Sequence, residues 1–313
     1  MSDSHFRAAD AVLSAKGRSF HWARRFLGDR HAARATRLYM LCRYVDDIAD
    51  EAEFVPAALQ ALAHMKQDIR SGRSTDPIVA DGIRLFEECG IDPDIFIELI
   101  AGVESDLGTV RIADTDALIH YCYRVAGTVG LMMCRILDAK EAAADAHAID
   151  LGIAMQLTNI CRDVGADAAL DRRYLPASMV GDLDPAALRQ PDADTAAIVR
   201  ATLSELLQLA DRYYQSGEHG LAYLPVAARA GILLAARVYH AIGSTLRQGG
   251  FAFENGRAVV GTRRKSLITL QALADFILHR RYWRVPVAHD AALHEPLHRV
   301  SMHTTLWNTR HAD

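Results

Sequence analysis

The stretch LYMLCRYVDDIADE, residues 38–51, places acidic side chains in a segment that is otherwise typical of a protein core. On a helix, positions three and four apart share one face. Tyr39, Arg43, Asp46 and Asp50 step along the chain by four, three and four residues, so they form a single stripe. The other faces of such a helix are apolar. We therefore expect a helix that is surrounded by core and turns its polar stripe towards an internal space.

A second segment, AMQLTNICRDVGADAALDRRYLP at 154–176, repeats this arrangement. Gln156, Asn159, Asp163 and Asp167 step by three, four and four residues along one face, and their neighbours are apolar. Each of the two segments therefore contributes a pair of carboxylates one helical turn apart, with amides or an arginine a turn before them.

Four carboxylates that converge in a half-buried space need counter-charges. Two carboxylates about 6 Å apart repel each other by about 3 kcal/mol at an effective dielectric constant near 20. Oxygen ligands from Asp and Asn select hard cations, and Mg²⁺ shares its coordination sphere with phosphate oxygens. The pattern therefore predicts Mg²⁺, with Mn²⁺ as the alternative, bridging a diphosphate between the two helices. Arg43 and Arg162 lie beside the acids, where they would orient them or bind the released diphosphate.

A solvated surface pair is the competing interpretation of these acids. It is the common explanation for a single Asp-x-x-x-Asp on a helix. Two such pairs, each embedded in apolar sequence and each preceded by polar residues in register, favour the functional interpretation.

Helical periodicity dominates the rest of the sequence. Half of the residues are hydrophobic, and Gly, Pro, Asp and Ser occupy the breaks between periodic segments. The expected helices are 6–15, 30–51, 56–71, 78–89, 93–105, 115–137, 141–164, 195–217, 226–249 and 262–281. Since no linker or repeat divides the chain, we predict a single all-α domain over 1–282. An irregular tail is expected over 283–313, where the periodicity is lost.

Composition argues against several classes of protein. The net charge of −4 provides no basic surface for nucleic acid, so no nucleic-acid partner is expected. Five cysteines stand singly, which is typical of a reducing compartment. The first residues lack the apolar stretch of a secretory signal, and no apolar run approaches the ~18 residues of a membrane span. We expect a cytoplasmic protein whose contact with a membrane, at the inner face, is peripheral; its oligomeric state is left open.

The motifs resemble those of a known family. RYVDDIAD (43–50) and the second acidic segment are similar to the two aspartate-rich signatures of the squalene and phytoene synthases, the head-to-head prenyl synthases. Between them, YCYRVAGTVGLMM (121–133) resembles the central helix of that family in the form usual for its bacterial phytoene-forming members. RSF (18–20), AARVYHAIG (235–243) and RAVVGTRRKSL (257–267) also follow the order of the family.

The resemblance implies a fold and a set of site residues. The fold is an isoprenoid-synthase-type helical bundle around a deep central cavity, with the two acidic helices facing each other at its mouth. The implied metal ligands are Asp46, Asp50, Asn159, Asp163 and Asp167. The residues implied to bind substrate are Ser19, Phe20, Tyr39, Arg43, Tyr121, Val125, Val129, Gly130, Gln156, Asn159, Arg162 and Tyr239. The residues implied to act in catalysis are Asp46, Asp50, Asp163, Asp167, Arg43 and Tyr239.

The resemblance also implies a reaction. Two geranylgeranyl diphosphates condense head to head through a cyclopropyl (prephytoene) diphosphate to phytoene, the first committed step of carotenoid biosynthesis. Bound Mg²⁺ assists the departure of diphosphate, and water must be excluded because it would trap the carbocations. This route uses no NADPH.

Three alternatives are weighed. A member of the same family would use farnesyl diphosphate and make dehydrosqualene, hydroxysqualene or squalene, but the 121–133 block favours the longer substrate. A non-catalytic helical assembly factor on the same fold would be expected to lose the metal ligands, which this sequence retains. A chain-elongating prenyltransferase would show a second DDxxD, whereas Val164 follows Asp163.

Three other features allow a structural interpretation. Gly127 and Gly130 either leave a slot for an isoprenoid or permit close helix packing. The basic TRRK (262–265) is a solvated patch, or else it meets diphosphate or anionic lipid. The tail contains His289, His294, His298 and His303. Their spacings do not form a tight ligand set, so we predict no metal site there.

Overall fold

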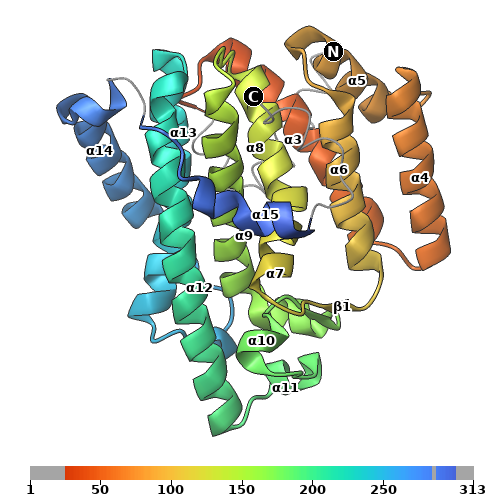
Figure 1. Cartoon of the computed structure of the whole chain (residues 1–313), viewed down its shortest axis with the longest axis vertical. Helices are drawn as coiled ribbons and strands as arrows, with labels where there is room; N and C mark the ends of the chain where they lie inside the picture. Colours follow the sequence, from red (N-terminus) through yellow and green to blue (C-terminus); the bar gives the residue numbers. More distant parts are fainter. Residues whose placement is uncertain (1–24, 284–286, 301–313) are drawn as a thin grey trace.

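A computed structural model describes residues 25–283 and 287–300, which form an all-α bundle (Figure 1). Its helices are α3 (Asp29–Asp50), α4 (Val55–Ser71), α5 (Pro77–Cys89), α6 (Pro93–Glu104), α7 (Thr115–Cys122), α8 (Thr128–Ile136), α9 (Ala143–Ala169), α10 (Ala177–Val180), α11 (Pro185–Arg189), α12 (Ala193–His219), α13 (Val226–Gln248), α14 (Thr262–Leu278) and α15 (Glu295–Val300). Its helical turns are η1 (Ser105–Leu107), η2 (Tyr123–Gly127), η3 (Gly220–Tyr223), η4 (Phe253–Asn255), η5 (Arg280–Tyr282) and η6 (Ala291–His294). Strands β1 (Val110–Arg111) and β2 (Arg172–Arg173) form one short parallel pair. The predicted all-α fold is confirmed, whereas the helix expected at 6–15 lies outside the described residues.

Several helix ends coincide with capping residues that the sequence provides. Asp76 and Asp92 precede α5 and α6, and their carboxylates accept hydrogen bonds from the first backbone N–H groups, while proline takes the first helical position. Helices α4 and α5 end at Gly72 and Gly90, which adopt the left-handed conformation at little cost. Such local signals explain why the expected and observed bounds of these helices agree closely.

Helix α9 is the central element of the bundle, with α8, α12 and α13 packed around it (Figure 1). It ends at Ala169 rather than at the expected residue 164, so Asp167 is part of it. Helix α3, which carries the first acidic stripe, packs against α4, α5, α6 and α8. The apolar flanks of both acidic helices are buried in one core: Val45 of α3 and Leu157 of α9 have no exposed surface.

The helix expected at 115–137 is interrupted. Helix α7 passes into the π-helical turn η2 before α8 begins at Thr128. A π-helical turn holds an extra residue, so it rotates the faces of the helix that follows. This turn and α8 together form one wall of the cavity described below.

Close backbone contacts join α8 and η2 to α9. A Cβ added to Gly130 would lie 2.1 Å from the carbonyl oxygen of Ala148, and one added to Gly152 would lie 2.2 Å from that of Ala126. A side chain at either glycine would force the helices apart. Close packing is therefore a sufficient reason for Gly130, which also reaches the cavity.

The segment after Tyr282 contains more regular structure than the sequence indicates. Within 287–300, η6 leads into α15, which packs against α7. Leu293 and Leu297 are buried, and the hydroxyl of Tyr213 donates to the carbonyl oxygen of Leu293 at 2.7 Å. This segment crosses the face of the bundle over α9 (Figure 1).

Candidate active site

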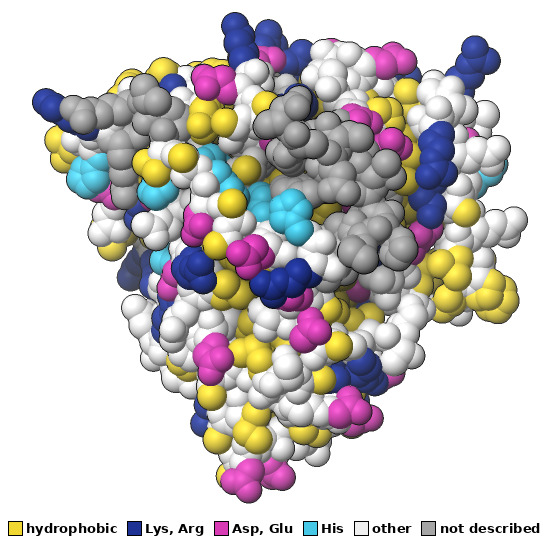
Figure 2. Space-filling view, in the orientation of Figure 1, with side chains coloured by type: hydrophobic (Ala, Val, Ile, Leu, Met, Phe, Trp, Pro, Cys, Tyr) yellow, Lys and Arg dark blue, Asp and Glu magenta, His cyan; other side chains and the backbone are white. Residues whose placement is uncertain are grey.

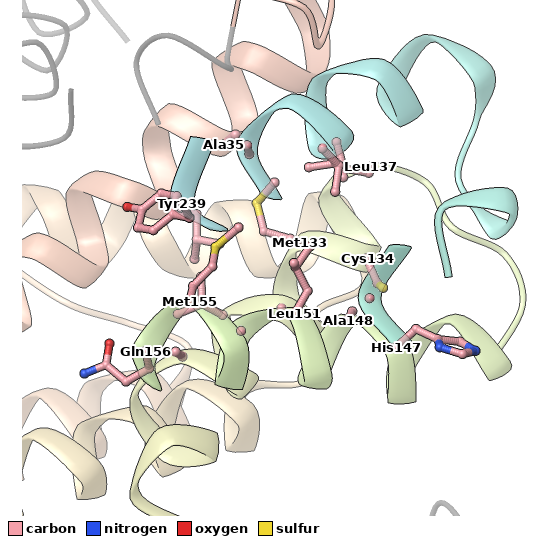
Figure 3. A pocket seen from close by; sticks show the side chains of 18 of the residues that line it. Ala35, Met133, Cys134, Leu137, His147, Ala148, Leu151, Met155, Gln156 and Tyr239 are labelled. Atoms are coloured by element: carbon pink, nitrogen blue, oxygen red, sulfur yellow. The ribbon is translucent and has the colours of Figure 1, made fainter. Parts of the chain in front are cut away.

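A cavity of about 310 Å³ lies inside the bundle between α3, α8, α9 and α13. Figure 3 shows Gln156 and Tyr239 at one end, His147 at the other, and Met155 and Leu151 between them. The wall follows α9 from Ala144 to Asn159, which corresponds to about 22 Å of helix. Its length and apolar lining suit a long hydrocarbon chain.

Many residues implied by the sequence to bind substrate or metal meet at this cavity. Those in its wall are Tyr39, Asp46, Val125, Val129, Gly130, Gln156, Asn159 and Tyr239. They come from α3, η2, α8, α9 and α13. Ser19 and Phe20 lie outside the described residues. The polar side chains of Asp46, Gln156 and Asn159 distinguish one end of an otherwise apolar cavity.

Asp46 brings a carboxylate to this polar end from α3. Burial raises the pKa of its carboxyl group to about 7; Arg43 opposes this shift, and the nearby carboxylates of Asp50 and Asp106 add to it. Arg43 itself donates to Asp47, four residues later, with Nε 2.8 Å from Oδ1. The strongest partner of Arg43 is thus Asp47, which stands beside Asp46 in the sequence.

The two acids of α9 differ in environment. Asp163 is only 8% exposed. Burial raises its pKa, but hydrogen bonds from Arg162 and Arg257 outweigh this, and the pKa lies below the usual value. Among the described residues, no arginine donates such a hydrogen bond to Asp167; burial and the neighbouring charge of Asp163 raise its pKa to about 7.

Arg172 connects the two acidic helices. It lies in β2, just after α9, and its Nη1 donates to Oδ1 of Asp50 on α3 at 3.2 Å. Its charge also lowers the pKa of Asp167. One guanidinium group therefore interacts with acids of both stripes, so the stripes border a common space.

A fifth carboxylate, Asp106, belongs to the same space. It follows α6, in η1, and accepts hydrogen bonds from the hydroxyls of Tyr121 at 2.9 Å and Tyr174 at 2.7 Å. Burial raises its pKa, and its charge acts on both Asp46 and Asp167. Tyr121, implied by the sequence to bind substrate, therefore holds Asp106 and is not part of the cavity wall.

Sequence reasoning missed Asp106, Arg172, Arg257 and Tyr174. The last three stand inside the quoted motifs DRRYLP and RAVVGTRRKSL, but their spacing predicted no role. Asp106 stands in a segment without periodicity. Its place depends on how η1 packs beside α7 and β2, which no local pattern reveals.

The donor atoms suit a hard divalent cation. All of them are carboxylate or amide oxygens. The Oδ1 of Asn159 is buried and accepts no hydrogen bond within the part of the chain that the structure describes, and its Nδ2 donates weakly to Gln156 at 3.4 Å. Asp46 and Asp167 receive no hydrogen bond from other side chains of the described segments. Buried acceptors without donors are costly, and coordination to a metal would satisfy them.

Comparisons with known proteins agree with this geometry. The family model described as squalene/phytoene synthase matches residues 13–264. This chain belongs to the squalene/phytoene synthase family. Within that family, a phytoene synthase of Rhodobacter capsulatus is 34% identical over 300 residues, which cover 90% of this chain and 87% of that protein. A phytoene synthase of Cereibacter sphaeroides is 34% identical over 269 residues, covering 80% and 74%.

Solved structures show the same fold. A dehydrosqualene synthase in complex with ligand superposes with a TM-score of 0.76 at 25% identity, covering 87% of this chain and 96% of that one. Squalene/phytoene synthases are divalent-metal-dependent enzymes that act on prenyl diphosphates, and this chain is a prenyltransferase-type enzyme. None of the helices in the described segments is long and apolar enough to cross a membrane.

Proposed function

We infer that this chain is a phytoene synthase. It joins two geranylgeranyl diphosphates head to head through prephytoene diphosphate to phytoene, the first committed step of carotenoid biosynthesis. The observation that carries this conclusion is the similarity to phytoene synthases over 80% and 90% of the chain. The long apolar cavity, with Asp46, Gln156 and Asn159 among its lining residues, supports it.

The proposed metal is Mg²⁺, with Mn²⁺ as a substitute. Its ligands would be Asp46, Asp50, Asn159, Asp163 and Asp167. When bound, Mg²⁺ neutralises the diphosphate and stabilises the negative charge that develops on it as it leaves. The buried amide oxygen of Asn159 and the raised pKa values of Asp46 and Asp167 support this assignment.

The chain's own cations and aromatic rings have complementary roles. Arg43, Arg162 and Arg257 lie at or beside the acids and would contact the diphosphate. Tyr39 and Tyr239 line the cavity next to its polar end, where their ring faces would stabilise the allylic cation. The apolar wall excludes water, which would otherwise trap the cation as an alcohol. Ser19 and Phe20 are assigned to the substrate site by resemblance alone.

Product analysis tests this function against the farnesyl-using alternative, which the solved dehydrosqualene synthase represents. Purified protein is incubated with Mg²⁺ and either geranylgeranyl or farnesyl diphosphate, without NADPH, and the hydrocarbon is identified by mass spectrometry. We expect phytoene from the longer substrate. Dehydrosqualene from farnesyl diphosphate, with no product from the longer substrate, would refute the assignment.

We also propose that α14 rests on the inner face of a membrane that contains anionic lipid. Its solvent-facing stripe consists of Leu267, Leu270, Ile277 and Leu278, which are 55% to 73% exposed. The spacing of three, seven and one residues keeps them on one side of the helix. Arg263 and Arg280, both exposed, stand at its two ends. An apolar stripe between basic residues is the pattern of an interfacial helix.

Cosedimentation with vesicles tests this contact. We expect binding to vesicles with anionic lipid and a loss of at least tenfold in the L270E/I277E double variant. The L59E/I198E double variant, which places the same two charges at exposed apolar positions of α4 and α12, is the matched control. Equal binding of both variants would count against α14.

A further inference from the structure

A buried aspartate on α9 is bound by two histidines of the C-terminal segment. Asp150 has no exposed surface. Nε2 of His289 lies 2.8 Å from its Oδ2, and Nε2 of His294 lies 2.8 Å from its Oδ1. The two nitrogens and a carboxylate oxygen lie within 4.8 Å of one another. The sequence did not predict this, because the partner of the two histidines stands 139 and 144 positions earlier in the chain.

The charge of Asp150 requires compensation. Burial raises its pKa, but hydrogen bonds from His289 and His294 more than offset this, so the carboxylate form is favoured. No arginine or lysine within 25–283 and 287–300 forms an ion pair with it. A buried carboxylate without a cation is costly. The charge of Asp150 is therefore compensated either by the hydrogen bonds from Ser216, His289 and His294 alone or by a metal ion held by Asp150 and both histidines.

The donors and their surroundings favour a metal. Two imidazole nitrogens and a carboxylate are the protein ligands of many Zn²⁺ sites, at about 2.0–2.1 Å from the ion. A bound ion would take the place of the two hydrogen bonds between the histidines and Asp150. Supporting hydrogen bonds surround them. The hydroxyl of Ser216 donates to Oδ2 of Asp150. His147 donates from Nδ1 to the carbonyl oxygen of Ser216 at 2.9 Å, and its ring meets that of His289 edge-on, 5.3 Å between centroids. Such outer contacts orient the ligands of metal sites.

We propose that Asp150, His289 and His294 bind one Zn²⁺ ion, which fastens the C-terminal segment to α9. The site is distinct from the acids of the active site: Asp150 precedes Asp163 by thirteen residues, about 20 Å along α9. His147, one turn before Asp150, lines the cavity end opposite Gln156 (Figure 3). The proposed ion therefore lies close to that end of the cavity, where the ring of His147 contacts that of His289. Figure 2 shows histidine side chains gathered on the face that this segment crosses.

Metal content and spectroscopy of the full chain test the proposal. Protein stripped with a chelator is titrated with Zn²⁺, and with Co²⁺ as a coloured substitute, and the bound metal is counted. We expect one tightly bound equivalent of metal and, with Co²⁺, the absorption of a four-coordinate site. The Tm should be about 5 °C higher when the free Zn²⁺ concentration is about a hundredfold above Kd. The D46N/D163N double variant should retain all three signals, which separates this ion from the active-site metal.

Two variants distinguish a bound metal from hydrogen bonding alone. His289→Gln and His294→Gln each keep an N–H donor for Asp150 but remove a Zn²⁺ ligand. Both variants should therefore fold but lose the bound equivalent of Zn²⁺, the Co²⁺ spectrum and the rise in Tm. His64→Ala is the control, since His64 pairs with Asp68 on the surface, is 74% exposed and should change nothing. Failure of the wild type to take up a stoichiometric ion would overturn the proposal and leave Asp150 held by hydrogen bonds alone. Retention of that ion in both Gln variants would also overturn it, because the ion would then be bound elsewhere.

Discussion

The guanidinium group of Arg257 donates two hydrogen bonds to the carboxylate of Asp163, at 2.6 and 2.7 Å, across 94 positions of sequence. Arg162 donates to the same two oxygens at 2.8 and 2.6 Å. Two cations therefore share one acid, which lies one helical turn beyond Asn159, a residue of the cavity wall. Because phosphate oxygens accept the same forked donors as a carboxylate does, we expect both arginines to contact an arriving diphosphate.

Loss of Arg257 should weaken substrate binding. A hydrogen bond to a charged group contributes about 1.5–3 kcal/mol, so Arg257→Ala should lower kcat/KM by about 10- to 100-fold, mainly through KM. Steady-state kinetics with the prenyl diphosphate measure this. Arg84→Ala removes an arginine that is 62% exposed on α5 and should leave kcat/KM unchanged. A kcat/KM for Arg257→Ala equal to that of wild type would show that this arginine serves only Asp163.

Asp46→Asn and Asp163→Asn should each abolish turnover, by at least about 10²–10³-fold, without loss of the fold. The reason is that these carboxylates would serve cations, whereas the packing of α3 and α9 depends on their apolar faces. Product assays and far-ultraviolet circular dichroism measure the two effects. Glu51→Gln, at an exposed position just after α3, is expected to be nearly silent. Loss of helix signal in the Asp variants would instead indicate a structural ion-pair role.

The stabilising effect of Mg²⁺ should grow with pH. Burial raises the pKa of Asp46 and of Asp167 from 3.8 to about 7. Between pH 4 and 7 the folded metal-free protein keeps protons that the unfolded chain has released, so these two groups lower its stability as pH rises. Mg²⁺ needs the carboxylate forms and must displace those protons.

Thermal melts with and without Mg²⁺ therefore provide a direct measurement. The rise in Tm should be small at pH 5.5 and several degrees at pH 8. In the D46N/D167N double variant the rise in Tm should be small at both pH values. A Tm rise that is independent of pH in the wild type would mean that Mg²⁺ binds elsewhere.

Gly130→Ala should destabilise the fold. The added Cβ would meet the carbonyl oxygen of Ala148 at 2.1 Å, and relief requires α8 to move away from α9. Overpacking of this kind costs about 1–3 kcal/mol, so Tm should fall by several degrees. Gly165→Ala is the matched control on α9, because its Cβ would lie 3.8 Å from the nearest atom; it should be neutral or stabilising. A stable Gly130→Ala protein would show that the α8–α9 contact can relax.

Much of this molecule could be predicted from local sequence. The apolar spacing and the caps Asp76 and Asp92 determine helices through interactions among neighbouring residues. The same periodicity placed Asp46 and Asp50 on one face and Asp163 and Asp167 on another. Because helical geometry is regular, these stripes do not depend on the rest of the chain.

Only the tertiary structure decided which distant groups meet. Arg257 donates to Asp163 from a loop, and His289 contacts Asp150 from the C-terminal segment. Asp106 accepts hydrogen bonds from Tyr121 and Tyr174. The π-helical turn η2 likewise breaks a helix that local periodicity continues. Each of these depends on packing between elements far apart in sequence, and periodicity along one helix carries no information about the neighbour that its face will meet.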